Sequence, residues 1–274
     1  MTAVMVDSTT SSWHWRRQNQ MTSWNLMHAF WKMTWTEIKV FVREPIAAFF
    51  TLVCPLMFLF LFGSIYGNRP SSYFGGFGSV DISVPGYIAI IIANTGLISL
   101  AVTIANYREN GVLRRMRASP VGSLTVLGSQ LAVAYAMTSL GVALLIIAAR
   151  AVYGLRFAGS PIGVFCAFSI SAFAIFSVGF LLAGVAPTGR AAQVAGFVLF
   201  FPMIFLSGAT IPREVLPETT RHYAQILPLT HVVSLLRGMW AGDPWEAHYK
   251  ESLLLAGLLM VCTLISSKTF RWES

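Results

Sequence analysis

The chain has 274 residues, of which 55% are hydrophobic and 11% are charged, whereas about a quarter of the residues in a soluble domain are charged. The apolar residues fall in uncharged blocks of about 20, the length that crosses a bilayer as a helix. The formal net charge of +8 does not indicate nucleic-acid binding, because most cations flank the apolar blocks and form no dense basic tract. We therefore expect an all-α integral membrane protein that contacts lipid and binds no nucleic acid.

The N-terminal 45 residues are expected to divide into a tail and an amphipathic helix. Residues 1–23 lack the apolar core of a signal peptide and are interpreted as a cytoplasmic tail. Residues 24–45 are predicted to form a helix with Trp31 and Trp35 on its aromatic face and basic side chains on one flank. A basic, tryptophan-rich helix of this kind lies in the membrane interface, and packing on a soluble core is the alternative.

Six apolar segments are predicted to cross the membrane as helices within a transmembrane domain of residues 46–274. A helix rises about 1.5 Å per residue, so the first segment reaches roughly 31 Å, the thickness of the hydrocarbon layer. The predicted spans are about 46–66, 84–106, 124–149, 163–186, 192–211 and 252–267.

The Lys and Arg residues fall unevenly on the two sides of these spans. With the N-terminus inside, the inner segments hold more of the 19 cations than the outer segments do. The positive-inside rule then places both termini in the cytoplasm. We expect a multi-pass protein of the plasma membrane, specifically of a bacterial inner membrane.

The connection between the fifth and sixth spans, residues 212–251, is predicted to fold. It holds many apolar residues that need burial, which argues against an unstructured loop. Pro217 and Pro228 each stand where a proline can open a helix. We expect two short extracellular helices, 217–226 and 228–240, lying at the membrane surface.

The predicted spans contain no groups suited to catalysis or ion coupling. All 11 acidic residues and all 5 histidines lie outside them, whereas ion-coupled carriers usually place an ionisable group near the midplane. Cys54, Cys166 and Cys262 lie in three different spans without metal-ligand spacing. The chain also lacks the Gly-x-x-x-x-Gly-Lys-Ser/Thr phosphate-binding loop. We predict no catalytic residue, metal or cofactor in this chain, so ATP-driven transport would need another polypeptide.

The polar segment between the second and third spans, residues 107–120, carries the most informative pattern. Gly111 permits a turn, Pro120 ends the element, and apolar residues at helical spacing form one face beside several arginines. One interpretation is an ordinary positively charged loop. The other is a short helix that docks on a cytoplasmic partner.

This segment resembles the coupling-helix signature of type-2 ABC exporter permeases. That family usually has Thr or Ser after the glycine, where this chain has Val112. The coupling-helix residues that the resemblance implies are Glu109, Gly111, Val112, Leu113, Arg114, Met116, Arg117 and Pro120.

A second stretch resembles the connection between the last two spans of the same family. It comprises residues 207–217, the Leu-Pro-Leu-Thr-His sequence at 227–231 and the Leu-Leu-Arg-Gly sequence at 235–238. It is more similar to the drug and antibiotic exporters, including the daunorubicin-resistance permeases, than to the polysaccharide branch. The resemblance implies export of a hydrophobic or amphipathic small molecule; a polysaccharide or glycolipid exporter, and a carrier or channel without ATP coupling, are the alternatives.

The resemblance also implies partners and a substrate path. Each permease subunit would pair with a second one, most simply another copy of this chain, and would sit on a cytoplasmic ATPase that binds ATP and Mg. A substrate path would run at the dimer interface, lined chiefly by the second and fifth spans. The candidates for lining it are Asn94, Phe197, Phe201, Met203 and Phe205, and those for an extracellular gate are Pro212, Pro217, Tyr223, Pro228 and His231.

Overall fold

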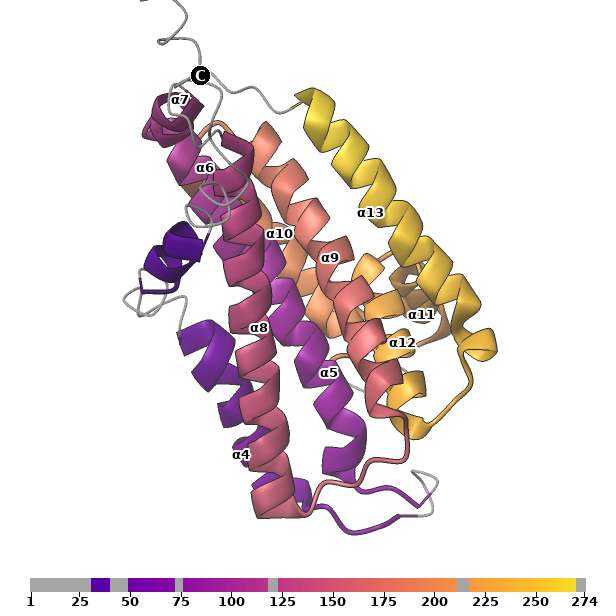
Figure 1. Ribbon diagram of the computed structural model, residues 1–274. Helices are drawn as coiled ribbons and strands as arrows, with labels where there is room; N and C mark the ends of the chain where they lie inside the picture. Colours follow the sequence, from indigo (N-terminus) through magenta and orange to yellow (C-terminus); the bar gives the residue numbers. More distant parts are fainter. Residues whose placement is uncertain (1–30, 40–48, 72–75, 118–122, 211–216, 270–274) are drawn as a thin grey trace, which may run out of the picture.

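The computed structural model describes residues 31–39, 49–71, 76–117, 123–210 and 217–269, and within these ranges the chain is helical without strands. Six helices among them are long and apolar enough to cross a membrane, and they stand side by side as one bundle (Figure 1). These six run Phe49–Tyr66, Ser79–Glu109, Thr125–Tyr153, Pro161–Val185, Gly189–Leu206 and Trp245–Ser266. The prediction of six apolar spans is therefore confirmed.

The helical elements are more numerous than the spans, because two spans contain a change of helix type. In chain order, after a helix at 31–39, they are η1 Phe49–Val53, α4 Cys54–Tyr66, α5 Ser79–Asn94, η3 Thr95–Leu100, α6 Ala101–Glu109, α7 Val112–Arg117, α8 Ser123–Tyr153, α9 Pro161–Val185, α10 Gly189–Leu206, α11 Glu218–Ala224, α12 Pro228–Ala241, η5 Trp245–His248 and α13 Tyr249–Thr269.

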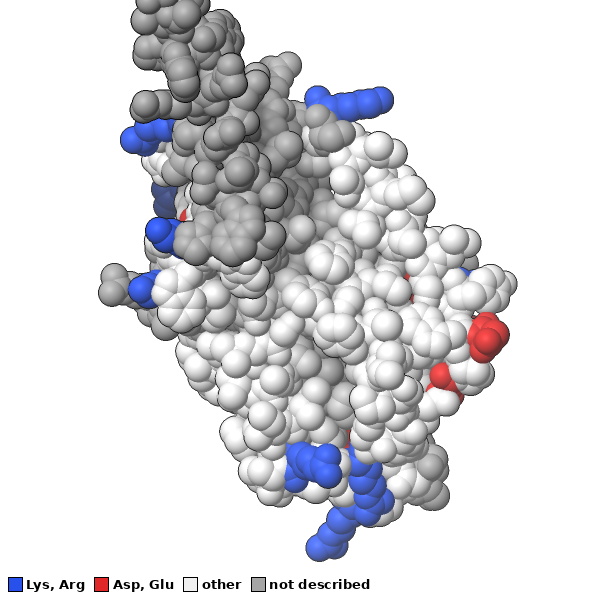
Figure 2. Space-filling model, in the orientation of Figure 1, with Lys and Arg blue, Asp and Glu red and all other residues white. Residues whose placement is uncertain are grey.

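Several helices differ in length from the predicted spans. The second begins at Ser79 and ends at Glu109, and the third extends to Tyr153, because helices can continue with polar residues once they leave the hydrocarbon. The fifth is shorter than predicted and ends at Leu206. On the face shown in Figure 2, charged side chains gather toward the ends and edges of the bundle, and the broad central surface is uncharged.

The second span, α5–η3–α6, is the central post of the bundle. It is the most buried of the six spans, and its parts contact α4, α8, α9, α10 and α12. Its middle, η3, is a π-helix, a wide turn that alters the direction of the side chains that follow it.

Glycines let two other spans reach the backbone of this central post. A Cβ atom added at Gly179 of α9 would overlap the carbonyl oxygen of Gly96, and one at Gly196 of α10 would overlap that of Leu97. Both carbonyls belong to η3. Small residues that allow such close backbone approach are the usual means of joining helices in lipid.

The helices predicted in the long connection form, but one of them lies elsewhere than expected. Pro217 precedes α11 and Pro228 is the first residue of α12, as the prolines predicted. However, Leu229, Val232 and Leu235 are fully buried, and α12 packs against α5, α9 and α13. The prediction that both helices lie at the membrane surface is therefore wrong for α12, because its apolar side chains are buried between spans. Figure 1 shows α12 between α9 and α13.

We expect Gly179→Ala to destabilise the bundle, because its new Cβ would collide with the Gly96 carbonyl. Overpacking of this kind costs about 1–3 kcal/mol. The control is Gly257→Ala in α13, where no atom lies within 4 Å of an added Cβ, so the better helix propensity of alanine should leave stability equal or slightly raised. Thermal unfolding of the purified protein in detergent measures both, and equal midpoints for the two variants would contradict the contact.

Candidate functional site

The site lies at the end of the bundle where α6 passes into α7 (Figure 1). The connecting turn is Asn110–Gly111, and Gly111 has φ of 65°, a left-handed conformation that glycine adopts without steric cost. The Gly111 amide donates to the carbonyl oxygen of Arg108 at 3.0 Å, and the Arg115 amide donates to that of Gly111 at 3.1 Å. The short helix α7 is thus fixed in direction relative to the central post.

The apolar face of α7 turns partly toward the bundle. Leu113 is 1% exposed and belongs to the hydrophobic core, and α7 contacts α6 and α8. Leu113 therefore packs α7 against the rest of the chain and does not face a partner. The Arg115 side chain, in contrast, is exposed. Pro120 lies outside the described residues, and only the backbone of Arg114, Met116 and Arg117 is described.

Three consecutive residues at the end of α6 connect the central post to other elements, and Tyr107 is the first. Its hydroxyl donates to the Glu37 carboxylate, at 2.7 Å from each oxygen. The Gln130 amide nitrogen on α8 donates to the same hydroxyl at 3.3 Å. Tyr107 therefore joins the post to the 31–39 helix and to α8.

Arg108 reaches the end of α9. Its Nη1 donates to the carbonyl oxygen of Gly184 at 2.8 Å, and its Nη2 donates to that of Ala186. The last carbonyls of a helix have no partner within the helix, and the negative end of the helix dipole favours a cation there. The guanidinium, on a residue that is 8% exposed, thus caps the C-terminus of α9.

Glu109 reaches the start of the next helix. Its Oε2 accepts a hydrogen bond of 2.8 Å from the amide of Gly189, the first residue of α10. A carboxylate is favoured at a helix N-terminus because the amide groups there lack intrahelical partners. Arg108 and Glu109 together hold both ends of the α9–α10 turn, and we call this pair the α6 clamp.

Sequence reasoning missed most of these contacts. The sequence pattern places Glu109 in the coupling segment without a partner, and it indicates only a polar loop for Tyr107 and Arg108. One available signal was the Thr188–Gly189 pair: Thr188 caps α10 by accepting from the Ala191 amide at 3.1 Å, which marks a helix start. Nothing in the local sequence predicts that this helix start lies beside Glu109.

The structure brings together three of the five candidates for a substrate path. Phe197, Phe201 and Phe205 follow one another at helical spacing on α10, and the first two rings stack with centroids 5.8 Å apart. Phe201 and Phe205 are 50% and 51% exposed. Their face of α10 is open on the outside of the chain.

The other two candidates lie inside the chain. Asn94 is buried, and its amide nitrogen donates to the Thr51 hydroxyl of η1 at 3.3 Å. Met203 is buried on the opposite side of α10 from the phenylalanines. Neither residue shares the open face of α10.

The gate candidates do not form one group in the structure. Pro212 lies outside the described residues, Pro217 and Pro228 begin helices, and Tyr223 on α11 is 69% exposed. His231 closes the turn between α11 and α12, because its Nε2 lies 2.9 Å from the carbonyl oxygen of Gln225. This contact gives His231 a structural role.

One acidic residue of the second span was not foreseen. Asp81 lies in the first turn of α5 and is 1% exposed. Its Oδ1 accepts from the Asn68 amide at 2.9 Å and the Arg156 backbone amide at 2.8 Å, and its Oδ2 accepts from the Gly78 amide at 2.9 Å. The expectation that all acidic residues lie outside the spans is wrong for Asp81 and Glu109 in the second helix and for Glu246 and Glu251 in the sixth, because these helices extend beyond the predicted spans. Backbone amides can satisfy the buried Asp81 carboxylate.

The bundle and its six apolar helices define a multi-pass membrane protein. Residues 28–240 match the family described as ABC-2 type transporter, and the chain belongs to that family. The match is to the membrane permease domain of that family.

Individual relatives are distant. The probable multidrug ABC transporter permeases YbhR and YbhS of Escherichia coli are 24% identical over 160 residues and 26% identical over 191 residues, covering 58% and 69% of this chain. The putative transport permease ycf38 of Cyanophora paradoxa is 24% identical over 214 residues, which are 74% of this chain and 71% of the relative. The matched region covers 44% of YbhR and 51% of YbhS, so the chain spans about half their length.

We expect Arg108→Met to lower the free energy of unfolding, because the carbonyls of Gly184 and Ala186 would lose their charged donor. Hydrogen bonds to charged groups contribute about 1.5–3 kcal/mol. The control is Arg115→Met, because the Arg115 side chain is exposed and donates only to the Asn110 carbonyl within its own turn. Thermal unfolding in detergent should show a clear loss for the first variant and little for the second; similar losses would contradict the clamp.

Proposed function

We propose that the chain is the transmembrane permease subunit of an ATP-binding cassette exporter, and that α7 passes the motion of a separate ATPase to the spans. ABC permeases pair with an ATPase subunit, which in this proposal binds ATP and Mg. The observation that carries the proposal is the α6 clamp, because it connects the base of α7 directly to α9 and α10. A push on α7 reaches the α9–α10 turn through one pair of side chains.

The proposed orientation places α7 and both termini in the cytoplasm. The helix at 31–39 supports it, since Trp31 and Trp35 are 63% and 61% exposed and Lys39 lies over the Trp35 ring at 5.5 Å. Exposed tryptophans beside lysines suit the boundary between acyl chains and anionic headgroups. In this orientation α11 and the turn that follows it lie on the outer side.

We propose the open face of α10 as the lining of the substrate path. Phe201 and Phe205 are half exposed and Phe197 is partly exposed, so together they offer flat apolar surfaces on the outside of the described chain. A second copy of the chain facing this helix would enclose a path between the two subunits. The aromatic lining favours a hydrophobic or amphipathic small molecule, such as a drug or antibiotic, and the multidrug designations of YbhR and YbhS point the same way.

The test reconstitutes the chain in vesicles with the ATPase that co-purifies with it and follows efflux of a lipophilic dye such as ethidium. We expect Glu109→Ala to reduce ATP-dependent efflux roughly tenfold, a coupling loss in the usual range, while ATP hydrolysis persists. Glu218→Ala on α11, which removes an exposed carboxylate far from the clamp, is the matched control and should transport normally. Efflux by the chain alone, driven by a pH gradient without the ATPase, would show a secondary carrier and refute the proposal.

A further inference from the structure

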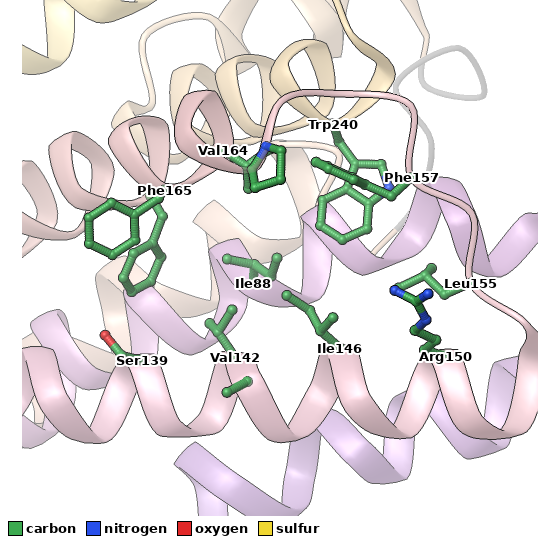
Figure 3. Close-up of a pocket in the computed structure, with 13 residues that line it drawn as sticks. Ile88, Ser139, Val142, Ile146, Arg150, Leu155, Phe157, Val164, Phe165 and Trp240 are labelled. Atoms are coloured by element: carbon green, nitrogen blue, oxygen red, sulfur yellow. The ribbon is translucent and has the colours of Figure 1, made fainter.

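A cavity of about 460 Å³ opens between α8 and α9 at the end of the bundle opposite α7 (Figure 3). Val142 and Ile146 of α8 face Val164 and Phe165 of α9 across it, and Ile88 of α5 forms its floor. Both helices pack on α5, and Tyr135 of α8 contacts Phe168 and Phe173 of α9, so the space is left farther along α8, from Ser139 to Arg150. Ligand sites in proteins commonly have volumes of about 300–1,000 Å³.

The surroundings of the cavity indicate that its mouth faces lipid. Neighbouring side chains on the outer surfaces of α8 and α9, such as Leu144, Ile147 and Ile162, are apolar and 38%, 64% and 76% exposed. These surfaces belong to helices that are long enough to cross the membrane. An acyl chain is therefore the nearest molecule that can enter.

The length of the cavity matches one leaflet. Ser139 lines one end and Arg150 the other, and a helix rises roughly 16 Å over the eleven positions between them. Half of the hydrocarbon layer is about 15 Å thick. Arg150 is in the last turn of α8, where the helix approaches the headgroups.

Two polar groups that line the cavity, the Arg150 guanidinium and the Trp240 indole, lie near the same end of it. The Arg150 side chain is exposed, and the ion pairs of the described residues do not include it. Trp240 is 5% exposed and lies with Phe157 over the Arg150 end, and its indole Nε1 has no hydrogen-bond partner. A guanidinium prefers a phosphate and an indole N–H can donate to an ester carbonyl.

We propose that this cavity binds one acyl chain of an anionic phospholipid from the leaflet opposite α7, with its phosphate paired to Arg150. The apolar walls hold the chain, and the Trp240 indole lies at the depth of the glycerol esters. The occupant is a lipid of the bilayer itself, since the opening faces the membrane and not the open face of α10.

The test uses the full chain in nanodiscs that contain phosphatidylglycerol with a photoreactive group in one acyl chain. We expect adducts on the peptides of Val142, Ile146 and Val164, and we expect unlabelled phosphatidylglycerol to compete better than phosphatidylcholine. Arg150→Gln should reduce that preference about fivefold, the contribution of one basic residue at a membrane surface. Arg156→Gln is the matched control, because this exposed arginine six positions later does not line the cavity.

A second variant tests the volume of the cavity. Val142→Trp should fill it and abolish the adducts while the variant still elutes as a folded protein. Adducts spread evenly over the bundle, or equal competition by the two lipids, would overturn the proposal. The measurement needs no ATP, so its result does not depend on the proposed export function. If ATP, added with the ATPase present, removed the adducts, the bound lipid would be transported cargo, and the proposal of a resident lipid would be overturned.

Discussion

The structure depends on the direct contact of helix backbones at η3. In lipid, apolar side chains gain little by leaving the solvent, so helices associate through close packing and hydrogen bonds. Gly179 and Gly196 supply the close packing by placing α9 and α10 against the carbonyl groups of Gly96 and Leu97. This contact joins the three spans through their backbones, and polar side chains join them again at the α9–α10 turn.

The charged residues of the second span are tolerated because they lie at its ends. A buried charge costs several kcal/mol unless polar groups surround it. The buried Asp81 accepts from the backbone amides of Gly78, which precedes α5, and of Arg156 in the loop after α8. The exposed Glu109 accepts from the amide of Gly189, the first residue of α10. Arg108 meets the carbonyl groups that close α9. Helix ends and one loop amide supply these hydrogen-bond partners, so the second span carries acidic or basic side chains at both ends and none in its middle.

The sequence predicts the number of spans, the short helix after Gly111 and the helix starts at Pro217 and Pro228, because apolar length and local turn chemistry determine them. It does not predict which way a residue faces in a span that is apolar on all sides, since no periodicity marks its inner face. Asn94 and Met203 were misplaced for this reason. The α6 clamp joins residues about 80 positions apart, which no local pattern reveals.

The glycine contacts limit how motion can pass through the bundle. Sliding α9 along η3 by one turn, about 5.4 Å, would bring Ile175 or Ala183 to the place of Gly179, and their Cβ atoms would strike the Gly96 carbonyl. The α6 clamp also fixes the turn between α9 and α10. In the proposed transporter, the second span, α9 and α10 must therefore move as one rigid body. The open face of α10 would then move with α7 and change the shape of a path built on it.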